Sequence, residues 1–217
     1  MKKYITEFIG TFFLVLVIGL SGNPIAIGGV LMIMVYMGGH ISGAHYNPAV
    51  SLAMLLQKEI NAKSFLYYTL FQILGAFLAA SFACQFHPTI SGLGMSTVNE
   101  FFGFLDFKPS GNAYKAELIW TFALVLVIFN VACSKRTKGN SYYGLAIGST
   151  VAVGAYIFGD ISGGVFNPAV EIGPMIVNAI AGNGINKGAL FLYTVFPILG
   201  GILAYYTYNF MNSKDSE

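Results

Sequence analysis

The chain has 217 residues, of which 56% are hydrophobic and only 9% are charged. An average soluble domain carries about 25% charged residues, so this composition excludes a water-soluble globular protein and predicts a polytopic membrane protein. The formal net charge of +2 does not point to a polyanionic partner such as nucleic acid, because basic residues in a membrane protein report its orientation.

Apolar stretches long enough to cross a bilayer, at about 20 residues each, follow one another along the chain. We predict six spans, at residues 5–20, 25–39, 64–86, 113–133, 142–158 and 188–210. The second and fifth are expected to be short, and each leads into a shorter apolar run, at 49–56 and 169–180. Because a helix rises only about 1.5 Å per residue, these shorter runs cannot span the bilayer, and we predict half-helices.

The chain contains an internal repeat. The stretch EFIGTFFLVL from Glu7 is similar to ELIWTFALVL from Glu117, and FQILGAFLA in the first half is similar to FPILGGILA in the second. The phrase SGAHYNPAV from Ser42 recurs as SGGVFNPAV from Ser162, with six of its nine residues identical. The predicted order of elements in each half of the chain is therefore helix, helix, half-helix and helix.

Three spans per half is an odd number, so the second half must enter the membrane from the opposite side, which predicts an inverted repeat. We expect a single transmembrane domain over residues 1–217, with repeat one at about 1–88 and repeat two at about 112–212, joined by an external loop. The basic N-terminus also fits a signal peptide. Glu7 interrupts that apolar run, however, and the run recurs in the second half, so a first membrane span is the preferred interpretation.

The basic residues favour one orientation of the chain. With both termini inside, eight basic residues face the cytoplasm and three face outside. The cytoplasmic set is Lys2, Lys3, Lys58, Lys63, Lys135, Arg136, Lys138 and Lys214, and the outer set is Lys108, Lys115 and Lys187. We therefore predict a multi-pass protein of the plasma (inner) membrane with both termini in the cytoplasm.

The predicted half-helices begin with two identical phrases, Asn47-Pro48-Ala49 and Asn167-Pro168-Ala169. Asn is a favoured N-cap and Pro is favoured at the first helical position, so one such phrase alone indicates only a capped helix start. Two copies in inverted repeats predict half-helices whose N-termini meet near the bilayer centre. Each N-terminus carries about +0.5 charge. The two asparagines also offer amide donors, so the sequence predicts a polar passage for neutral solutes that repels cations.

The phrase GHISGAHYNPAV from Gly39 resembles the first pore loop of the major intrinsic protein family, the aquaporins and aquaglyceroporins. The resemblance covers essentially the whole chain. It implies an all-α membrane fold with six transmembrane helices, two re-entrant half-helices and an inverted repeat, assembled as a homotetramer with one pore per subunit. The implied function is a passive channel through the lipid bilayer for water and small uncharged solutes.

The resemblance also implies roles for residues that support the pore loops. Glu7 and Glu117 match buried glutamates that accept backbone hydrogen bonds from these loops; the alternative is that each marks a misplaced helix end. Gln72 matches a position packed against the same network. His45 matches a histidine that lines the cytoplasmic vestibule.

In this family four positions form a narrow filter, and counting from the two asparagines places them at Ile27, Ala155, Gly164 and Val170. In the order of these four positions, water-selective members resemble the set Phe, His, Cys or Thr, and Arg. Glycerol channels resemble the set of an aromatic residue, Gly, a second aromatic residue and Arg. This chain has neither set, and Val170 replaces the arginine. We therefore predict a wide, apolar filter that admits glycerol, urea or ammonia beside water.

Glu171, in the first turn of the second predicted half-helix, has two interpretations that the sequence leaves open. It is either a carboxylate stabilised by the helix N-terminus and hydrogen-bonded to nearby backbone, or a pore-mouth acid that acts with Asp160. The long connection at 89–111 is expected to lie over the outer mouth or to fold into it.

Cys84 and Cys133 are expected near opposite membrane faces, too far apart to form a disulfide. We expect both to be packing residues.

A structural or adhesive membrane protein of the same fold, with low permeability, is the alternative function. An enzyme is not expected, because the sequence has no Cys–His pair, no HExxH motif and no paired acids at catalytic spacing. It also has no nucleotide, haem or metal motif, so we expect neither a cofactor nor a metal site.

Overall fold

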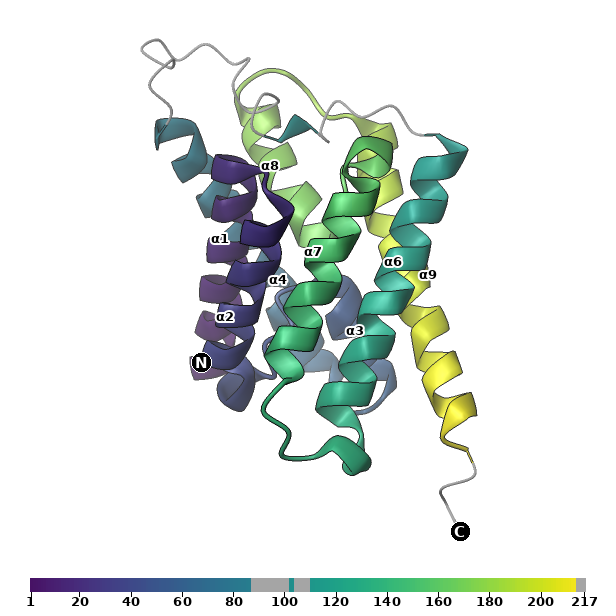
Figure 1. The fold of residues 1–217 in the computed structure, drawn as a ribbon. Helices are drawn as coiled ribbons and strands as arrows, with labels where there is room; N and C mark the ends of the chain where they lie inside the picture. Colours follow the sequence, from purple (N-terminus) through teal and green to yellow (C-terminus); the bar gives the residue numbers. More distant parts are fainter. Residues whose placement is uncertain (87–101, 104–109, 214–217) are drawn as a thin grey trace.

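The computed structural model describes residues 1–86, 102–103 and 110–213, and these residues form helices and no strand (Figure 1). The helices are α1 (Lys2–Ser21), α2 (Pro24–Ser42), α3 (Pro48–Leu56), α4 (Ala62–Phe86), α6 (Gly111–Ile128), α7 (Tyr143–Ser162), α8 (Pro168–Ile180) and α9 (Lys187–Met211). A π-helical turn, Phe129–Cys133, extends α6, and a 3₁₀ turn, Lys135–Thr137, follows it. All but α3 and α8 are long and apolar enough to cross a membrane. The predicted all-helical fold class is confirmed.

Helices α2 and α7 are longer than predicted. They contain 19 and 20 residues, because each continues past the expected end to Ser42 or Ser162. The glycine that follows each serine, Gly43 or Gly163, has a positive φ, of 90° and 82°, and forms the left-handed cap that ends a helix. The prediction of two short spans is therefore wrong, since the glycines rather than the apolar pattern set where these helices end.

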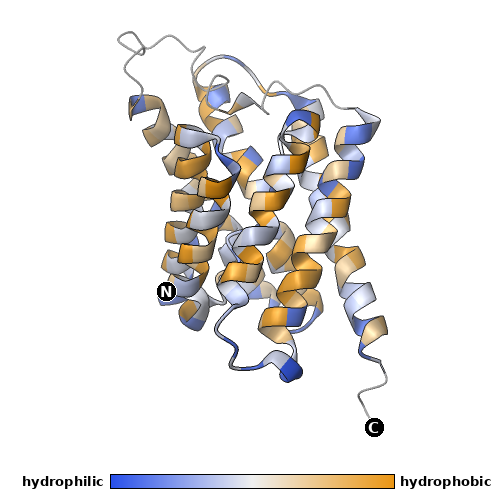
Figure 2. Cartoon of the chain, viewed as in Figure 1, coloured by the Kyte–Doolittle hydropathy of each residue, from blue (hydrophilic) through white to orange (hydrophobic). Residues whose placement is uncertain are grey.

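Apolar side chains cover the outer surface of the helix bundle. Figure 2 shows hydrophobic residues along the lengths of the helices and hydrophilic residues gathered mainly at their ends and connections. Ile25, Tyr156 and Phe210 are 80%, 81% and 82% exposed. A continuous apolar surface of this kind would drive association in water. It is suited to the hydrocarbon core of a bilayer.

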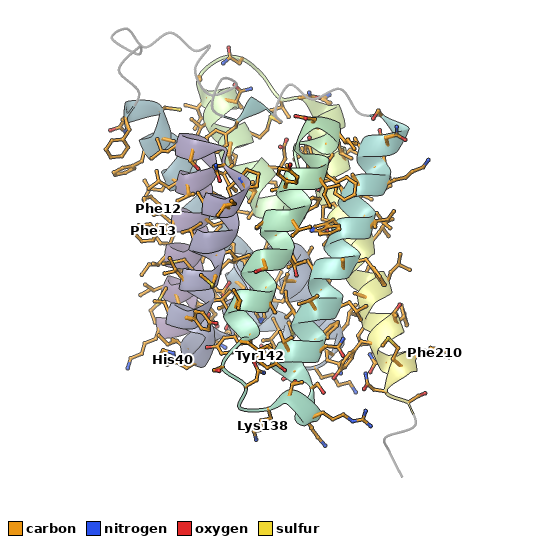
Figure 3. All side chains as sticks on the ribbon, in the orientation of Figure 1. Phe12, Phe13, His40, Lys138, Tyr142 and Phe210 are labelled. Atoms are coloured by element: carbon orange, nitrogen blue, oxygen red, sulfur yellow. The ribbon has the colours of Figure 1, made fainter. Side chains whose placement is uncertain are left out.

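The N-terminus and the C-terminal end of α9 lie at one end of the bundle, together with the connection between α6 and α7 (Figure 1). Figure 3 shows Lys138 and Tyr142 of this connection at that end, which we name the terminal end. The predicted cover over the outer mouth, at 89–111, lies mostly outside the described residues. Phe102, which is described, is fully buried and packs against Gly19 in the last turns of α1.

Glycines let the helices approach closely at matching places in the two repeats. The main helix pairs are α1 with α4, α6 with α9 and α2 with α7. A Cβ atom at Gly75 would collide with a backbone carbonyl oxygen of α1, and a Cβ atom at Gly200 would collide with one of α6. Gly28 and Gly148 face each other in the same manner between α2 and α7. Small residues of this kind allow membrane helices to pack backbone to backbone.

We expect Gly28→Ala to lower the thermal stability of the protein and Gly29→Ala to leave it unchanged or raise it. The methyl group at Gly28 would collide with the backbone of α7, and overpacking of this kind costs about 1–3 kcal/mol. At Gly29 a methyl group meets no described atom within 4 Å, and alanine is favoured over glycine in a helix by about 1 kcal/mol. Thermal unfolding in detergent measures both variants. Equal midpoints would contradict the assigned contact between α2 and α7.

Candidate functional site

The half-helices α3 and α8 meet at their N-termini, and the two predicted asparagines join them. Asn47 caps α3 by accepting the Ala49 N–H at 2.8 Å, and Asn167 caps α8 in the same way at 3.0 Å. Each side-chain amide also donates to the opposite loop. Asn47 Nδ2 donates to the Phe166 carbonyl at 2.8 Å, and Asn167 Nδ2 donates to the Tyr46 carbonyl at 2.9 Å. Each asparagine therefore starts its own half-helix and holds the other loop.

The loops that precede α3 and α8 have an unusual backbone. Ala44, Tyr46 and Phe166 have φ angles of 52°, 51° and 50°, in the left-handed region that side chains disfavour. Gly164, which matches Ala44 in the second loop, has a φ of 61°. Each such non-glycine residue costs on the order of 1–3 kcal/mol and persists only where its surroundings hold it in place. Both loops therefore need a strong support.

Glu7 of α1 supports the first loop, and its carboxylate accepts four hydrogen bonds in all. Its carboxylate accepts the backbone N–H groups of His45 and Tyr46 at 3.0 and 2.7 Å, and the Ser42 hydroxyl at 2.6 Å. Gln72 of α4 donates its Nε2 to the same carboxylate at 2.8 Å. Glu7 and Gln72 are fully buried, so these bonds, rather than solvent, satisfy the polar groups of the loop.

Glu117 of α6 supports the second loop at the matching position. It accepts the N–H groups of Val165 and Phe166 at 3.0 and 2.6 Å and the Ser162 hydroxyl at 2.7 Å. The second repeat has Pro197 where the first has Gln72, and no described residue supplies a fourth donor. Both glutamates are fully buried within helices. The alternative that they mark misplaced helix ends therefore has no support.

Glu171 lies at the N-terminus of α8, as the first interpretation expects, but it lacks the hydrogen bonds to nearby backbone that this interpretation also expects. It is fully buried in the first turn of α8, and neither carboxylate oxygen has a hydrogen-bond partner among the described residues. Asp160 is exposed near the end of α7, and neither acid lines the two cavities described below. The physical reason is a difference between the repeats. Glu171 stands where the first repeat has Ser51, whose hydroxyl accepts from Gln72 at 3.0 Å, and Pro197 offers no such donor.

A cavity of about 110 Å³ lies between the two loops. The residues predicted to form a filter all line it, namely Ile27, Ala155, Gly164 and Val170. His45, Asn47 and Asn167 add polar side-chain atoms, and no charged side chain of the described residues lines the cavity. One water site needs roughly 10–15 Å³, so the cavity has room for several water molecules.

A larger vestibule, of about 410 Å³, adjoins this cavity at the terminal end. Five residues line both spaces: Ala44, His45, Val50, Ile128 and Ile147. The Nδ1 atom of His45 lies 3.1 Å from the Ser51 hydroxyl, and no described residue bonds to its Nε2 atom. The lining of the two spaces runs from Gly22, just after α1, past both loops to Lys138 at the terminal end. It therefore follows the length of the bundle.

The sequence did not predict an aromatic cluster that lies beside the predicted filter residues. Trp120 of α6 donates its Nε1 to a backbone carbonyl of α7 at 2.8 Å. Phe158 and Phe166 pack against it with ring centroids 5.6 and 6.5 Å away. A Cβ atom at Gly164 would lie 3.6 Å from the Phe166 ring, so the cluster packs beside one of the predicted filter residues. A signal was present, because the chain's one Trp stands where the first repeat has Gly10.

Comparison with known proteins matches residues 1–208 to the family described as Major intrinsic protein. The chain belongs to this family. It is 37% identical to "Glycerol uptake facilitator protein-like 6" of Lactiplantibacillus plantarum, over 99% of this chain and 100% of that protein. It is 31% identical to "Probable aquaporin NIP-type" of Nicotiana alata, over 99% of this chain and 79% of that protein. Its fold is similar to the X-ray structure of the aquaglyceroporin from Plasmodium falciparum, with a TM-score of 0.80 and 24% identity over 96% and 95% of the two chains.

These similarities confirm the predicted family. Major intrinsic proteins are channels rather than enzymes, and this chain is an integral, multi-pass membrane channel for water and small solutes. The apolar outer surface agrees with that assignment, because it places hydrophobic side chains against lipid. Which solutes pass is a separate question that depends on the lining of the cavity.

Glu117→Gln is expected to destabilise the protein by about 1–3 kcal/mol. A carboxylate accepts hydrogen bonds on both of its oxygens. A glutamine amide has only one acceptor oxygen, and its NH₂ group would face the loop donors that the second carboxylate oxygen now accepts. At least one of the N–H groups of Val165 and Phe166 then loses its partner, and a buried unsatisfied group costs about 1–3 kcal/mol. Thermal unfolding in detergent measures the loss. Asp160→Asn, which changes an exposed acid, is the control, and equal midpoints for the two variants would refute the support role.

Proposed function

We propose that the protein is a passive channel that carries water together with small uncharged solutes such as glycerol, urea or ammonia. The observation that carries this proposal is the cavity between the two asparagine-capped loops, whose described lining contains no charged side chain. The similarity to proteins named as a glycerol uptake facilitator and an aquaporin supports it. In this proposal Ile27, Ala155, Gly164 and Val170 form the selectivity filter.

A solute in this passage meets donors and positive dipole ends at the point where the half-helices meet. Each half-helix N-terminus carries about +0.5 charge. The amide of each asparagine has two N–H groups, and one of them bonds the opposite loop, so the other is left for a passing solute. Water or glycerol can accept this hydrogen bond through an oxygen atom. A cation meets repulsion from two dipole ends and also loses hydration, so neutral solutes are favoured.

The filter selects by width rather than by charge in this proposal. Its four side chains offer no charge and little bulk, and Val170 stands where most relatives are expected to carry arginine. A unit charge about 5 Å from a passing ion, at an effective dielectric constant of 20 to 80, is worth roughly 1–3 kcal/mol. Without that charge, cation exclusion rests on the half-helix dipoles and on dehydration.

We further propose that both termini are cytoplasmic, that the protein resides in the plasma membrane, and that it forms a homotetramer. The terminal end carries the N-terminal lysines and Lys138, and the positive-inside rule assigns such an end to the cytoplasm. The matching contacts of Glu7 and Glu117 support two inverted repeats, at about 1–88 and 112–212, within one domain over residues 1–217. Membership of the family supports the proposed tetramer.

Asn47→Asp and Asn167→Asp are expected to lower water flux and to weaken proton exclusion. The carboxylate keeps the helix cap but loses the Nδ2 donor, and its negative charge offsets the positive half-helix ends. Asn23→Asp is the matched control, because Asn23 caps α2 before Pro24 but is exposed and does not line the cavity. Stopped-flow measurements on proteoliposomes give both fluxes. Folded Asn47 and Asn167 variants with wild-type flux would exclude this role.

Val170→Arg is expected to reduce the flux of glycerol and urea more than the flux of water. The arginine narrows the filter, and its charge lowers any cation leak by about fivefold or more, because it adds roughly 1 kcal/mol or more of repulsion. Val170→Leu, which adds bulk without charge, is the control for the cation leak. If the wild-type protein already rejects glycerol, urea and ammonia, and the arginine variant behaves identically, the wide-filter assignment fails.

The alternative is a structural or adhesive membrane protein with the same fold and a low permeability. The same measurements separate the two functions. A channel shows protein-dependent flux of water and of at least one of glycerol, urea and ammonia across the liposome membrane. An adhesive protein leaves liposomes as impermeable as those without protein.

A further inference from the structure

The second loop has a buried acid beside its support, and this acid has no hydrogen-bond partner among the described residues. Glu171 lies in the first turn of α8, directly after Val170, and is fully buried. Glu117 of α6 is close enough for the charges of the two side chains to interact. An ionised carboxylate is rarely buried without a donor, because nothing then replaces its lost hydration. Glu171 therefore needs either a donor or a proton.

In the first repeat a glutamine occupies the corresponding place. Gln72 Nε2 donates to Glu7 Oε2 at 2.8 Å and to the Ser51 hydroxyl at 3.0 Å. The second repeat has Pro197 in place of Gln72 and Glu171 in place of Ser51. A glutamate side chain is longer than a serine side chain. The carboxyl group of Glu171 can therefore extend toward the place that the glutamine amide takes in the first repeat.

The hydrogen bonds of Glu117 show which of its atoms lacks a donor. Oε1 of each supporting glutamate accepts two hydrogen bonds, one from a serine hydroxyl and one from a backbone N–H. Oε2 of Glu7 also accepts two, from the Tyr46 N–H and from Gln72. Oε2 of Glu117 accepts one bond from the described residues, from the Phe166 N–H at 2.6 Å. A carboxylate oxygen has two acceptor sites, so Glu117 Oε2 can accept one more donor.

Two titratable groups face Glu171, one on α6 and one on α9. The first is Glu117, and the second is Tyr193, which interacts with both acids but donates its one hydroxyl proton to a backbone carbonyl at 2.6 Å. On the other helices packed against α8, Glu7 of α1 and Tyr68 of α4 bond the first loop, and α3 has no titratable residue. An ionised Glu171 is only an acceptor, whereas a protonated Glu171 has an O–H donor.

We propose that Glu171 is a neutral carboxylic acid that donates a hydrogen bond to Glu117 Oε2 and thereby helps to hold the second loop beside the cavity. It is a positioning residue that takes the part of Gln72 in the first repeat. At alkaline pH a base in the buffer takes the proton: the O–H bond breaks, and its electron pair stays on the carboxylate. Two like charges then lie close together in a buried site, which weakens the support of the loop. The stabilisation is therefore present at lower pH and is lost as the pH rises.

Thermal unfolding of the full chain in detergent, measured from mildly acidic to alkaline buffer, tests the proton. Glu171→Gln keeps a donor that alkaline pH does not remove. Its midpoint should match the wild type at mildly acidic pH and exceed it by about 2–4 °C or more at alkaline pH. Asp160→Asn, which changes an exposed acid outside both cavities, is the control and should follow the wild type at every pH. Equal pH dependence of the wild type and Glu171→Gln would overturn the proposal.

A second set of variants tests the donor itself. Glu171→Ser alone should lower the midpoint at mildly acidic pH, because Glu117 Oε2 loses its added donor. Adding Pro197→Gln to Glu171→Ser rebuilds the pair of the first repeat and should raise the midpoint more than adding Pro197→Ala does. Both changes restore the helical N–H that proline lacks, so the difference between them reports the side-chain donor. Equal midpoints for the two double variants would show that this place needs no donor, which contradicts the proposal.

The consequence for transport is measured by stopped-flow water flux in proteoliposomes at the same pH values. This part rests on the proposed channel function, whereas the unfolding measurements do not. Flux through the wild type should fall at alkaline pH, and flux through Glu171→Gln should fall less. A fall of equal size in both proteins would refute the link between this proton and the passage. An absence of flux at every pH would instead refute the channel, and the unfolding curves would still decide the role of Glu171.

Discussion

The hydrogen bonds that two buried glutamates accept from the two non-helical loops are the interaction on which the rest of the structure depends. At membrane depth no bulk water is available to satisfy irregular backbone, and each unsatisfied polar group costs several kcal/mol. Glu7 and Glu117 each accept two neighbouring N–H groups and a serine hydroxyl. A carboxylate can do this because both of its oxygens are acceptors. The left-handed residues of the loops persist only because these bonds hold them.

The position of the held loops decides the chemistry of the passage. Since each loop ends at an asparagine that caps a half-helix, the two helix N-termini are brought face to face, and each amide bonds the opposite loop. The cavity that remains between them combines a few fixed donors with an apolar lining. Such a space offers hydrogen bonds to a neutral solute and offers no compensation for the hydration that an ion gives up.

The two repeats share the same order of helices and the same supporting glutamate, and they differ in the residues around that glutamate. In the first repeat Gln72 joins Glu7 to Ser51, and His45 reaches from this network into the vestibule. In the second repeat proline replaces that glutamine, a buried acid replaces the serine, and Trp120 packs against Phe166 beside the predicted filter residues. The terminal end of the passage is therefore polar, while the end that carries the predicted filter residues is apolar. One duplicated fold gives the two ends different chemistry.

The sequence by itself determined the approximate positions of the spans, the half-helices and the two asparagine phrases, though not where the second and fifth spans end, because hydrophobic length and helix capping are local properties that neighbouring residues encode. The resemblance of the sequence to the family also pointed to both glutamates. Only the tertiary structure decided that Glu171 has no hydrogen-bond partner among the described residues, that Trp120 packs beside the predicted filter residues, and that Cys133 meets Met54. Those contacts join segments far apart in the chain, and their formation depends on how the helices pack and on where the π-turn and the capping glycines redirect the backbone.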